Sequence, residues 1–175
     1  GDIGFPMVVH PREAETAWVF PMDGTSVWPR TAPGGRPAVF RSRDGGRSWS
    51  RGATGFPGAH GWLTAFRQAM TCDAQDPVGL YLGTTAGEIW ASGDEGASWR
   101  QIASHLPVVL AIEVVDDTAF YNPLHQKIFR AMNSLFERSE PIDAVTVTEE
   151  MRKMGTLDPS TDPLYLTELT MNVST

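Results

Sequence analysis

The chain has 175 residues, enough for one domain or two very small ones. Its apolar fraction of 41% supports a packed core, and its net charge of −7 argues against nonspecific binding to nucleic acid or anionic membranes, because such binding requires a basic surface. The single cysteine, Cys72, excludes an internal disulfide. No apolar run reaches the length of a membrane span and no signal segment opens the sequence, so we expect a cytoplasmic protein without a membrane partner.

The character of the chain changes near Glu113. Residues 1–112 contain all six tryptophans and 16 of the 17 glycines, with 9 basic and 10 acidic residues. Residues 113–175 contain no tryptophan, one glycine, and 5 basic against 11 acidic residues. Short apolar runs among glycines are typical of strands and tight turns, whereas spaced apolar residues without glycine indicate helices. The sequence therefore predicts an α+β chain, with a β domain at 1–112 and a helical domain at 113–175.

Five apolar runs in the first part predict short strands. They are Thr16–Phe20, Ala38–Arg41, Gly79–Gly83, Glu88–Ala91 and Val108–Val115. Turns rich in glycine, proline and aspartate separate them, and residues 29–37 predict a long loop. The expected arrangement is a set of antiparallel β-hairpins.

An eight-residue motif, S-x-D-x-G-x-S-W, occurs twice with a spacing of 50 residues. Its shared positions are Ser42, Asp44, Gly46, Ser48 and Trp49 in the first copy, and Ser92, Asp94, Gly96, Ser98 and Trp99 in the second. Each copy follows a strand-like run, which predicts a hairpin turn. Serine and aspartate can form hydrogen bonds within the turn, and glycine can adopt a conformation that other residues resist. We expect two equivalent turns with each tryptophan packed back on its own turn.

With this motif, residues 1–112 resemble the Asp-box, or BNR, repeats of sialidase-like β-propellers. Residues 76–90 also resemble the inner strands that precede such a box. The resemblance implies partial propeller blades whose boxes lie at the blade periphery, away from substrate. A propeller closes with about four to eight blades, and these residues supply about two. We therefore expect the open edges to be completed by copies of the chain or by a partner.

A complete sialidase active site is not recognisable in the sequence. That chemistry requires an arginine cluster, a Tyr–Glu pair and an acid/base aspartate. Tyr81 lies in an apolar strand and is interpreted as a core residue, while Arg41, Arg43 and Arg47 surround the first box and are interpreted as solvated turn residues. We expect no catalytic residue, metal or cofactor. A fragment of a sialidase-like glycoside hydrolase is the enzymatic alternative.

Start and stop signals divide the second part into three helices. The first helix begins at Asn122-Pro123 and covers 123–138. The second is capped by Asp143 or Thr146 and stops at Gly155. The third begins at 161–163, and its inward residues are Tyr165, Leu166 and Leu169. The apolar residues of the first helix predict one buried face and a candidate interface: Leu124, Ile128, Met132, Leu135 and Phe136. The charged residues 149–153 are interpreted as a solvated helix face.

Residues 111–175 resemble the N-terminal domain of bacterial replicative DNA helicases of the DnaB family. The resemblance is carried by residues 120–129, 137–146, 165–169 and 172–175. It implies a helical domain that builds the collar of a hexamer and helps to engage primase, without hydrolysing ATP. The first helices of that family are replaced here by β-type sequence, and no G-x-x-x-x-G-K-[ST] motif occurs in the 175 residues.

Together the two resemblances describe a chimera of two truncated families, natural or engineered. We expect a noncatalytic chain that self-associates or binds a partner, without direct contact to nucleic acid. A homo-oligomer is expected because each half lacks elements that cover its apolar faces in the parent family. A replication-collar module that binds primase or a helicase loader is a further alternative.

Overall fold

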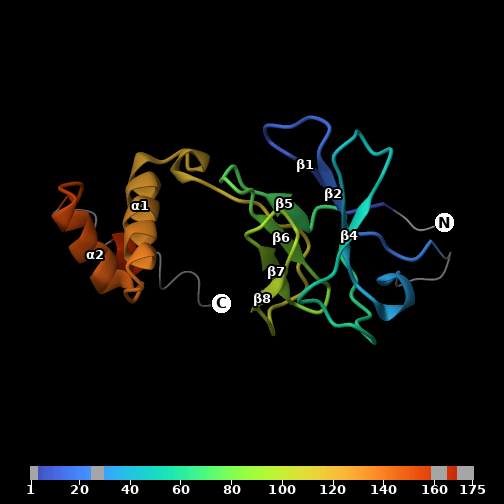
Figure 1. Ribbon diagram of the computed structural model, residues 1–175. Coiled ribbons are helices and arrows are strands. Elements are labelled where there is room, and N and C mark those ends of the chain that lie inside the picture. The colour runs from blue at the N-terminus through green and yellow to red at the C-terminus, as the bar shows by residue number, and fades with distance from the viewer. Residues whose placement is uncertain (1–3, 25–29, 159–164, 169–175) are drawn as a thin grey trace. The chain divides into compact units, whose positions relative to one another are not determined.

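A computed structural model of the chain describes residues 4–24, 30–158 and 165–168. It divides into two compact units, residues 1–114 and 115–175. Strands occur in the first unit and α-helices in the second (Figure 1). None of the helices within the described residues combines the length and the apolarity that a membrane span requires.

The first unit contains two four-stranded antiparallel sheets, and in each sheet every strand pairs with the next along the chain. Sheet 1 consists of β1 (Met7–Val9), β2 (Ala17–Val19), β3 (Val39–Ser42) and β4 (Ser50–Gly52), with a 3₁₀ turn, η1 (Pro33–Gly35), before β3. Sheet 2 consists of β5 (Met70–Cys72), β6 (Leu80–Gly83), β7 (Ile89–Ser92) and β8 (Arg100–Ala103).

The sequence patterns locate β2, β3, β6 and β7 but not the outer strands. β4 reads Ser-Arg-Gly and β8 reads Arg-Gln-Ile-Ala, so neither shows the apolar alternation of a half-buried strand. The predicted strand at Val108–Val115 is wrong. In the described chain this run forms only an isolated parallel bridge, between Ala111 and Gln68, because no antiparallel neighbour lies beside it.

One apolar core lies between the two sheets. It includes Trp18, Phe20 and Val39 from sheet 1 and its flanks, Leu80, Leu82 and Trp90 from sheet 2, and Phe56 and Trp99 from the connections. The ring centroid of Phe56 lies 5.0 Å from that of Trp90 and 5.2 Å from that of Trp99. Because side chains alternate along a strand, each sheet presents one face to this core and the other face away from it.

The second unit begins with a 3₁₀ turn, η2 (Asp117–Ala119), followed by α1 (Pro123–Glu137) and α2 (Ala144–Lys153). Asn122 caps α1, since its Oδ1 accepts the N–H of Leu124 at 2.9 Å. Asp143 caps α2, and Thr146 Oγ1 accepts the Asp143 N–H in return, which completes a capping box. Residues 165–168 are helical, while 161–163 and Leu169 lie outside the described residues.

The apolar face of α1 is narrower than its sequence predicts. Ile128 and Leu135 are buried, together with Ala131, but Met132 and Phe136 are exposed. Each residue advances by about 100° around a helix, so every four-residue step rotates the side chain by about 40° away from the buried face. Val147, Met151 and Leu166 complete the core on the other side.

Candidate interaction site

The two turns of the repeated S-x-D-x-G-x-S-W motif form the same set of hydrogen bonds. In each turn the aspartate Oδ1 accepts the hydroxyl of the first serine and the N–H of the second, and Oδ2 accepts the hydroxyl of the second serine. The three distances are 2.9, 2.9 and 2.6 Å around Asp44 and 2.7, 2.8 and 2.6 Å around Asp94. The first serine also accepts the N–H of the motif glycine, at 2.8 Å for Gly46 and 2.9 Å for Gly96. These polar groups are therefore used within the turns.

The same bonds hold both aspartates in the ionised form. Hydrogen bonds from the Ser48 hydroxyl and N–H lower the pKa of Asp44 to about 2. Partial burial of Asp94 acts in the opposite direction, but the hydrogen bonds from Ser98 and Ser92 outweigh it and lower its pKa as well. A carboxylate with a depressed pKa stabilises the fold above its unfolded-state pKa, about 4, and this stabilisation is lost as pH falls through the folded-state value.

We expect the D44N variant to melt at a lower temperature than the wild type at pH 7. The difference should shrink between about pH 4 and pH 2, because the wild-type carboxylate itself becomes protonated there. Thermal melts across this range measure the effect. D76N is the matched control, since the Asp76 side chain is 94% exposed. A D44N deficit that persists unchanged at pH 2 would contradict the assignment.

The tryptophans of the two turns differ, so the expectation of equivalent turns is wrong for them. The Trp49 indole donates to the Gly46 carbonyl oxygen at 3.1 Å and is 41% exposed. Trp99 is 4% exposed, stacks on Phe56, and its Nε1 has no hydrogen-bond partner among the described residues. The physical reason is that sheet 1 and Phe56 cover the second turn, whereas nothing described covers the first.

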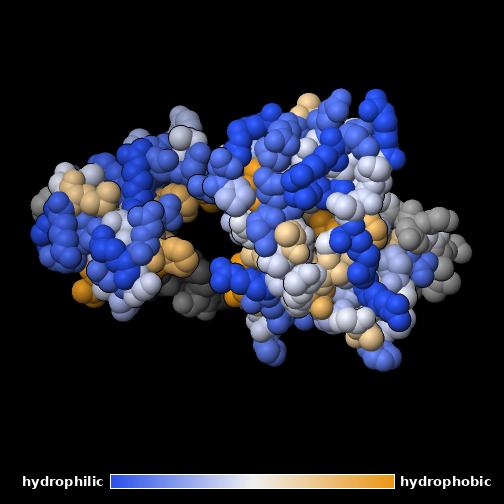
Figure 2. All heavy atoms as spheres, in the orientation of Figure 1, coloured by the Kyte–Doolittle hydropathy of each residue, from blue (hydrophilic) through white to orange (hydrophobic). Residues whose placement is uncertain are grey.

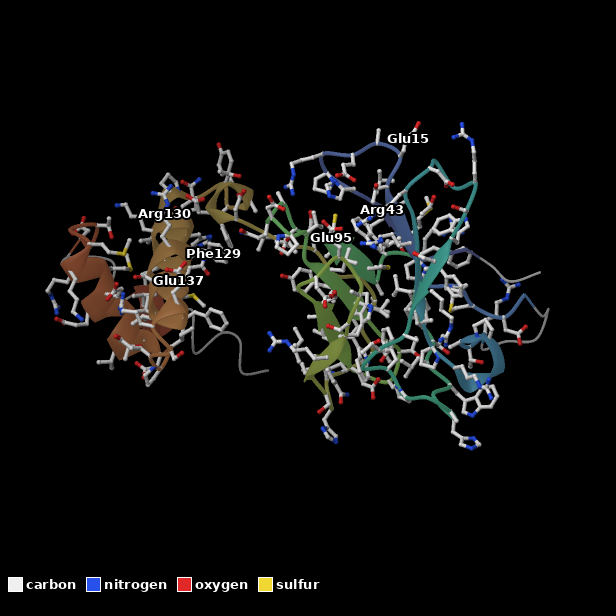
Figure 3. All side chains as sticks on the ribbon, in the orientation of Figure 1. Glu15, Arg43, Glu95, Phe129, Arg130 and Glu137 are labelled. Carbon is white, nitrogen blue, oxygen red and sulfur yellow. The ribbon has the colours of Figure 1, made fainter. Side chains whose placement is uncertain are left out.

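Glu95 joins the second turn to sheet 1. Its carboxylate accepts Arg41 Nη1 at 3.0 Å and Arg43 Nη2 at 3.3 Å, and its carbonyl oxygen accepts the Trp18 indole N–H at 2.8 Å. Figure 3 labels Arg43 and Glu95, whose side chains lie close together. The interpretation of Arg41 as a solvated turn residue is therefore wrong, whereas Arg47 is exposed and donates to the Asp44 carbonyl oxygen of its own turn.

Tyr81 is not a core residue. It lies on the face of β6 opposite Leu80 and Leu82, it is half-buried, and its hydroxyl donates to Asp73 Oδ2 at 3.0 Å. Burial, the hydrogen bond to Asp73 and the charge of Asp73 all raise the pKa of Tyr81. Burial and Asp73 also raise the pKa of the neighbouring Cys72 thiol, which disfavours the reactive thiolate.

Among the described residues, no group of three or more His, Cys, Asp or Glu side chains could hold a metal ion.

An ion-pair network joins the end of α1 to α2. Arg138 donates to both oxygens of Glu150, at 3.0 and 2.7 Å, and the Ser134 hydroxyl donates to Glu150 at 2.8 Å. Glu150 is buried, so the interpretation of residues 149–153 as a wholly solvated face is wrong. The bonds from Arg138 and Ser134 lower the pKa of Glu150 against the effect of burial. Their partners come from separate elements, and no local sequence signal identifies them.

A second row of apolar side chains on α1 lies outside the buried face that Ile128, Ala131 and Leu135 form. We define the α1 stripe as Phe129, Met132 and Phe136, whose spacing of three and four residues places them on one side of a helix. Phe129 is partly buried against Phe120, with ring centroids 5.1 Å apart, and Phe136 is 73% exposed. Figure 2 shows hydrophobic side chains at the surface of this unit among hydrophilic ones. Exposed aromatic side chains in such a row are typical of a protein-binding surface.

Comparison with known proteins relates this helical part to replicative helicases. Residues 107–175 match the family model described as DnaB-like helicase N terminal domain. The chain is 47% identical over 64 residues to Replicative DNA helicase DnaB of Rhodothermus marinus, covering 37% of this chain and 7% of that protein. It is 37% identical over 82 residues to Replicative DNA helicase DnaB of Leifsonia xyli, covering 47% and 18% respectively. Replicative DNA helicase DnaC of Bacillus subtilis is 41% identical over 68 residues, 39% of this chain and 15% of that protein.

The chain thus spans less than a fifth of the length of these curated relatives. The similarity supports the resemblance of the C-terminal part to a helicase N-terminal domain. These matches are to replicative helicases and include no sialidase-like family.

Proposed function

We propose that the helical unit is a noncatalytic partner-binding module, and that its partner is a protein of the bacterial replication machinery. The observation that carries the proposal is the match of residues 107–175 to a helicase N-terminal domain. The α1 stripe supplies the contact surface, because Phe136 and Met132 are exposed although they belong to the matched segment. The N-terminal domain of a replicative helicase is the first partner that we propose; primase and a helicase loader are the alternatives.

We further propose that residues 1–112 are two blades of the Asp-box propeller type, joined to the helical unit as a chimera of two truncated families. Two consecutive four-stranded meanders and the repeated turn bonds support this proposal. Within it the blades act as a scaffold, because Arg41 and Arg43 are paired with Glu95 and Tyr81 with Asp73. The alternative, a fragment of a sialidase-like hydrolase, predicts saturable turnover of a fluorogenic sialoside.

The partner proposal is tested by binding to purified replicative helicase, primase and loader. We expect the wild-type chain to bind one of them and F136S to bind at least about tenfold more weakly, because an aromatic anchor at an interface contributes a large part of the binding energy. V145S is the matched control, since it removes an exposed apolar side chain from α2. Binding to none of the three proteins, or equal loss in the two variants, would refute the proposal.

A further inference from the structure

Sheet 1 has an apolar face that the described residues cover only in part, since Val19 is buried there but Met7 is exposed. Met7, Val19 and Phe40 lie side by side on this face by strand register. Together with Gly4, Pro21 and Trp49 they line a cavity of about 410 Å³. We call this surface the outer face of sheet 1. Met7 is 54% exposed, although it lies beside the apolar residues Val19 and Phe40 on this face.

The internal repeat identifies the same face in sheet 2. The spacing of 50 residues makes Phe40 equivalent to Trp90, and Trp49 equivalent to Trp99. Strand register extends the equivalence, since Met7 pairs with Val19 as Met70 pairs with Leu82. All four members in sheet 2 are buried, whereas Met7 and Trp49 are exposed in sheet 1. The same surface is therefore covered in the second repeat, whereas in the first Val19 is buried but Met7 and Trp49 are exposed.

The second repeat is covered by sheet 1, which contributes Trp18 and Val39 to the shared core, and by Phe56, which packs on Trp90 and Trp99. Phe56 follows Gly55, whose φ is +92°, and precedes Pro57. The equivalent residue of the second repeat is Leu106.

Leu106 stands in the same local geometry as Phe56. It follows His105, whose φ is +61°, and it precedes Pro107. Leu106 is 41% exposed, compared with 7% for Phe56. Among its described residues, the first unit thus carries one exposed projecting apolar residue, Leu106, and one apolar face that is only partly covered.

We propose that the outer face of sheet 1 binds a second copy of this chain, whose Leu106 packs on Phe40 and Trp49 as Phe56 packs on Trp90 and Trp99. The contact is head to tail, because the two surfaces differ and each copy carries one of each. Within one chain, the Arg41–Glu95 ion pair also joins the two repeats. The contact between two copies lacks this ion pair, because Ala91 and Gly45 occupy the positions equivalent to Arg41 and Glu95. Association is therefore concentration-dependent and only weakly sensitive to salt. This contact is independent of the α1 stripe.

Sedimentation velocity of the full chain over the micromolar range tests the proposal. We expect the wild type to self-associate, and M7E and L106E each to weaken association at least tenfold. A mixture of M7E and L106E should form a 1:1 dimer and nothing larger, because one intact face and one intact Leu106 remain between the two variants. Restored association in the mixture also shows that both variants are folded.

F136S is the control that separates this contact from the helicase-type partner site, and it should associate as the wild type does. A wild-type chain that stays monomeric overturns the proposal. Association that survives in M7E and L106E, or that is lost in F136S, overturns it as well.

Discussion

Replacing Leu135 by alanine should lower the stability of the helical unit strongly, whereas the same change at the adjacent Phe136 should have little effect. Leu135 is 2% exposed and belongs to the cluster that joins α1 to α2 through Val147 and Met151. Removing a buried leucine side chain costs about 2–5 kcal/mol, because the cavity closes only in part. A unit of this size has a small core, so this cost is a large part of its free energy of unfolding.

Circular dichroism at 222 nm during urea unfolding measures this prediction, because the α-helices of the described residues lie in this unit. F136A removes a larger side chain from the next position of the same helix, and it controls for helix propensity because both variants introduce alanine. Equal midpoints for L135A and F136A would show that the buried face of α1 has been assigned to the wrong residues.

Signals that act over a few residues predict the helix ends and the two motif turns. Asn122, Asp143 and Gly155 mark the helix ends because a cap needs only the adjacent backbone. The turns of the repeated motif are predicted for the same reason, since the three bonds to the Asp44 carboxylate join residues within four positions. Local chemistry of this kind is visible in the residue types themselves.

Contacts between distant segments are not visible in this way. Arg41 and Glu95 are 54 positions apart, and nothing around either residue indicates the other. The exposure of Trp49 and the burial of Trp99 follow from what covers each turn, although the two motifs have identical key residues. On α1 the error has a geometric cause, because a run of four-residue steps looks continuous in sequence but drifts around the helix. The small buried residue Ala131 is a better guide to the inner face than Met132.

Replacing Gly55 by alanine should separate the two sheets, and this is the largest effect that we expect in the first unit. A Cβ at Gly55 would lie 1.7 Å from the carbonyl oxygen of Trp99. The chain must then move away at the point where the Trp99 N–H donates to the Thr54 carbonyl at 2.9 Å. That movement also lifts Phe56 from the two tryptophans it covers.

G45A is the matched control for this change. Gly45 and Gly55 both have positive φ, at +67° and +92°, but a Cβ at Gly45 would meet no atom within 4 Å. Both variants therefore bear the left-handed backbone cost of about 1–2 kcal/mol, and only G55A bears the clash, which adds about 1–3 kcal/mol or more. Tryptophan fluorescence during denaturant unfolding measures the difference, because Trp90 and Trp99 lie in the affected core. We expect a clearly lower unfolding midpoint for G55A than for G45A. Coincident midpoints would mean that Gly55 does not hold the sheets together. They would also mean that the contact of Phe56 with Trp90 and Trp99 tolerates a shift of the backbone.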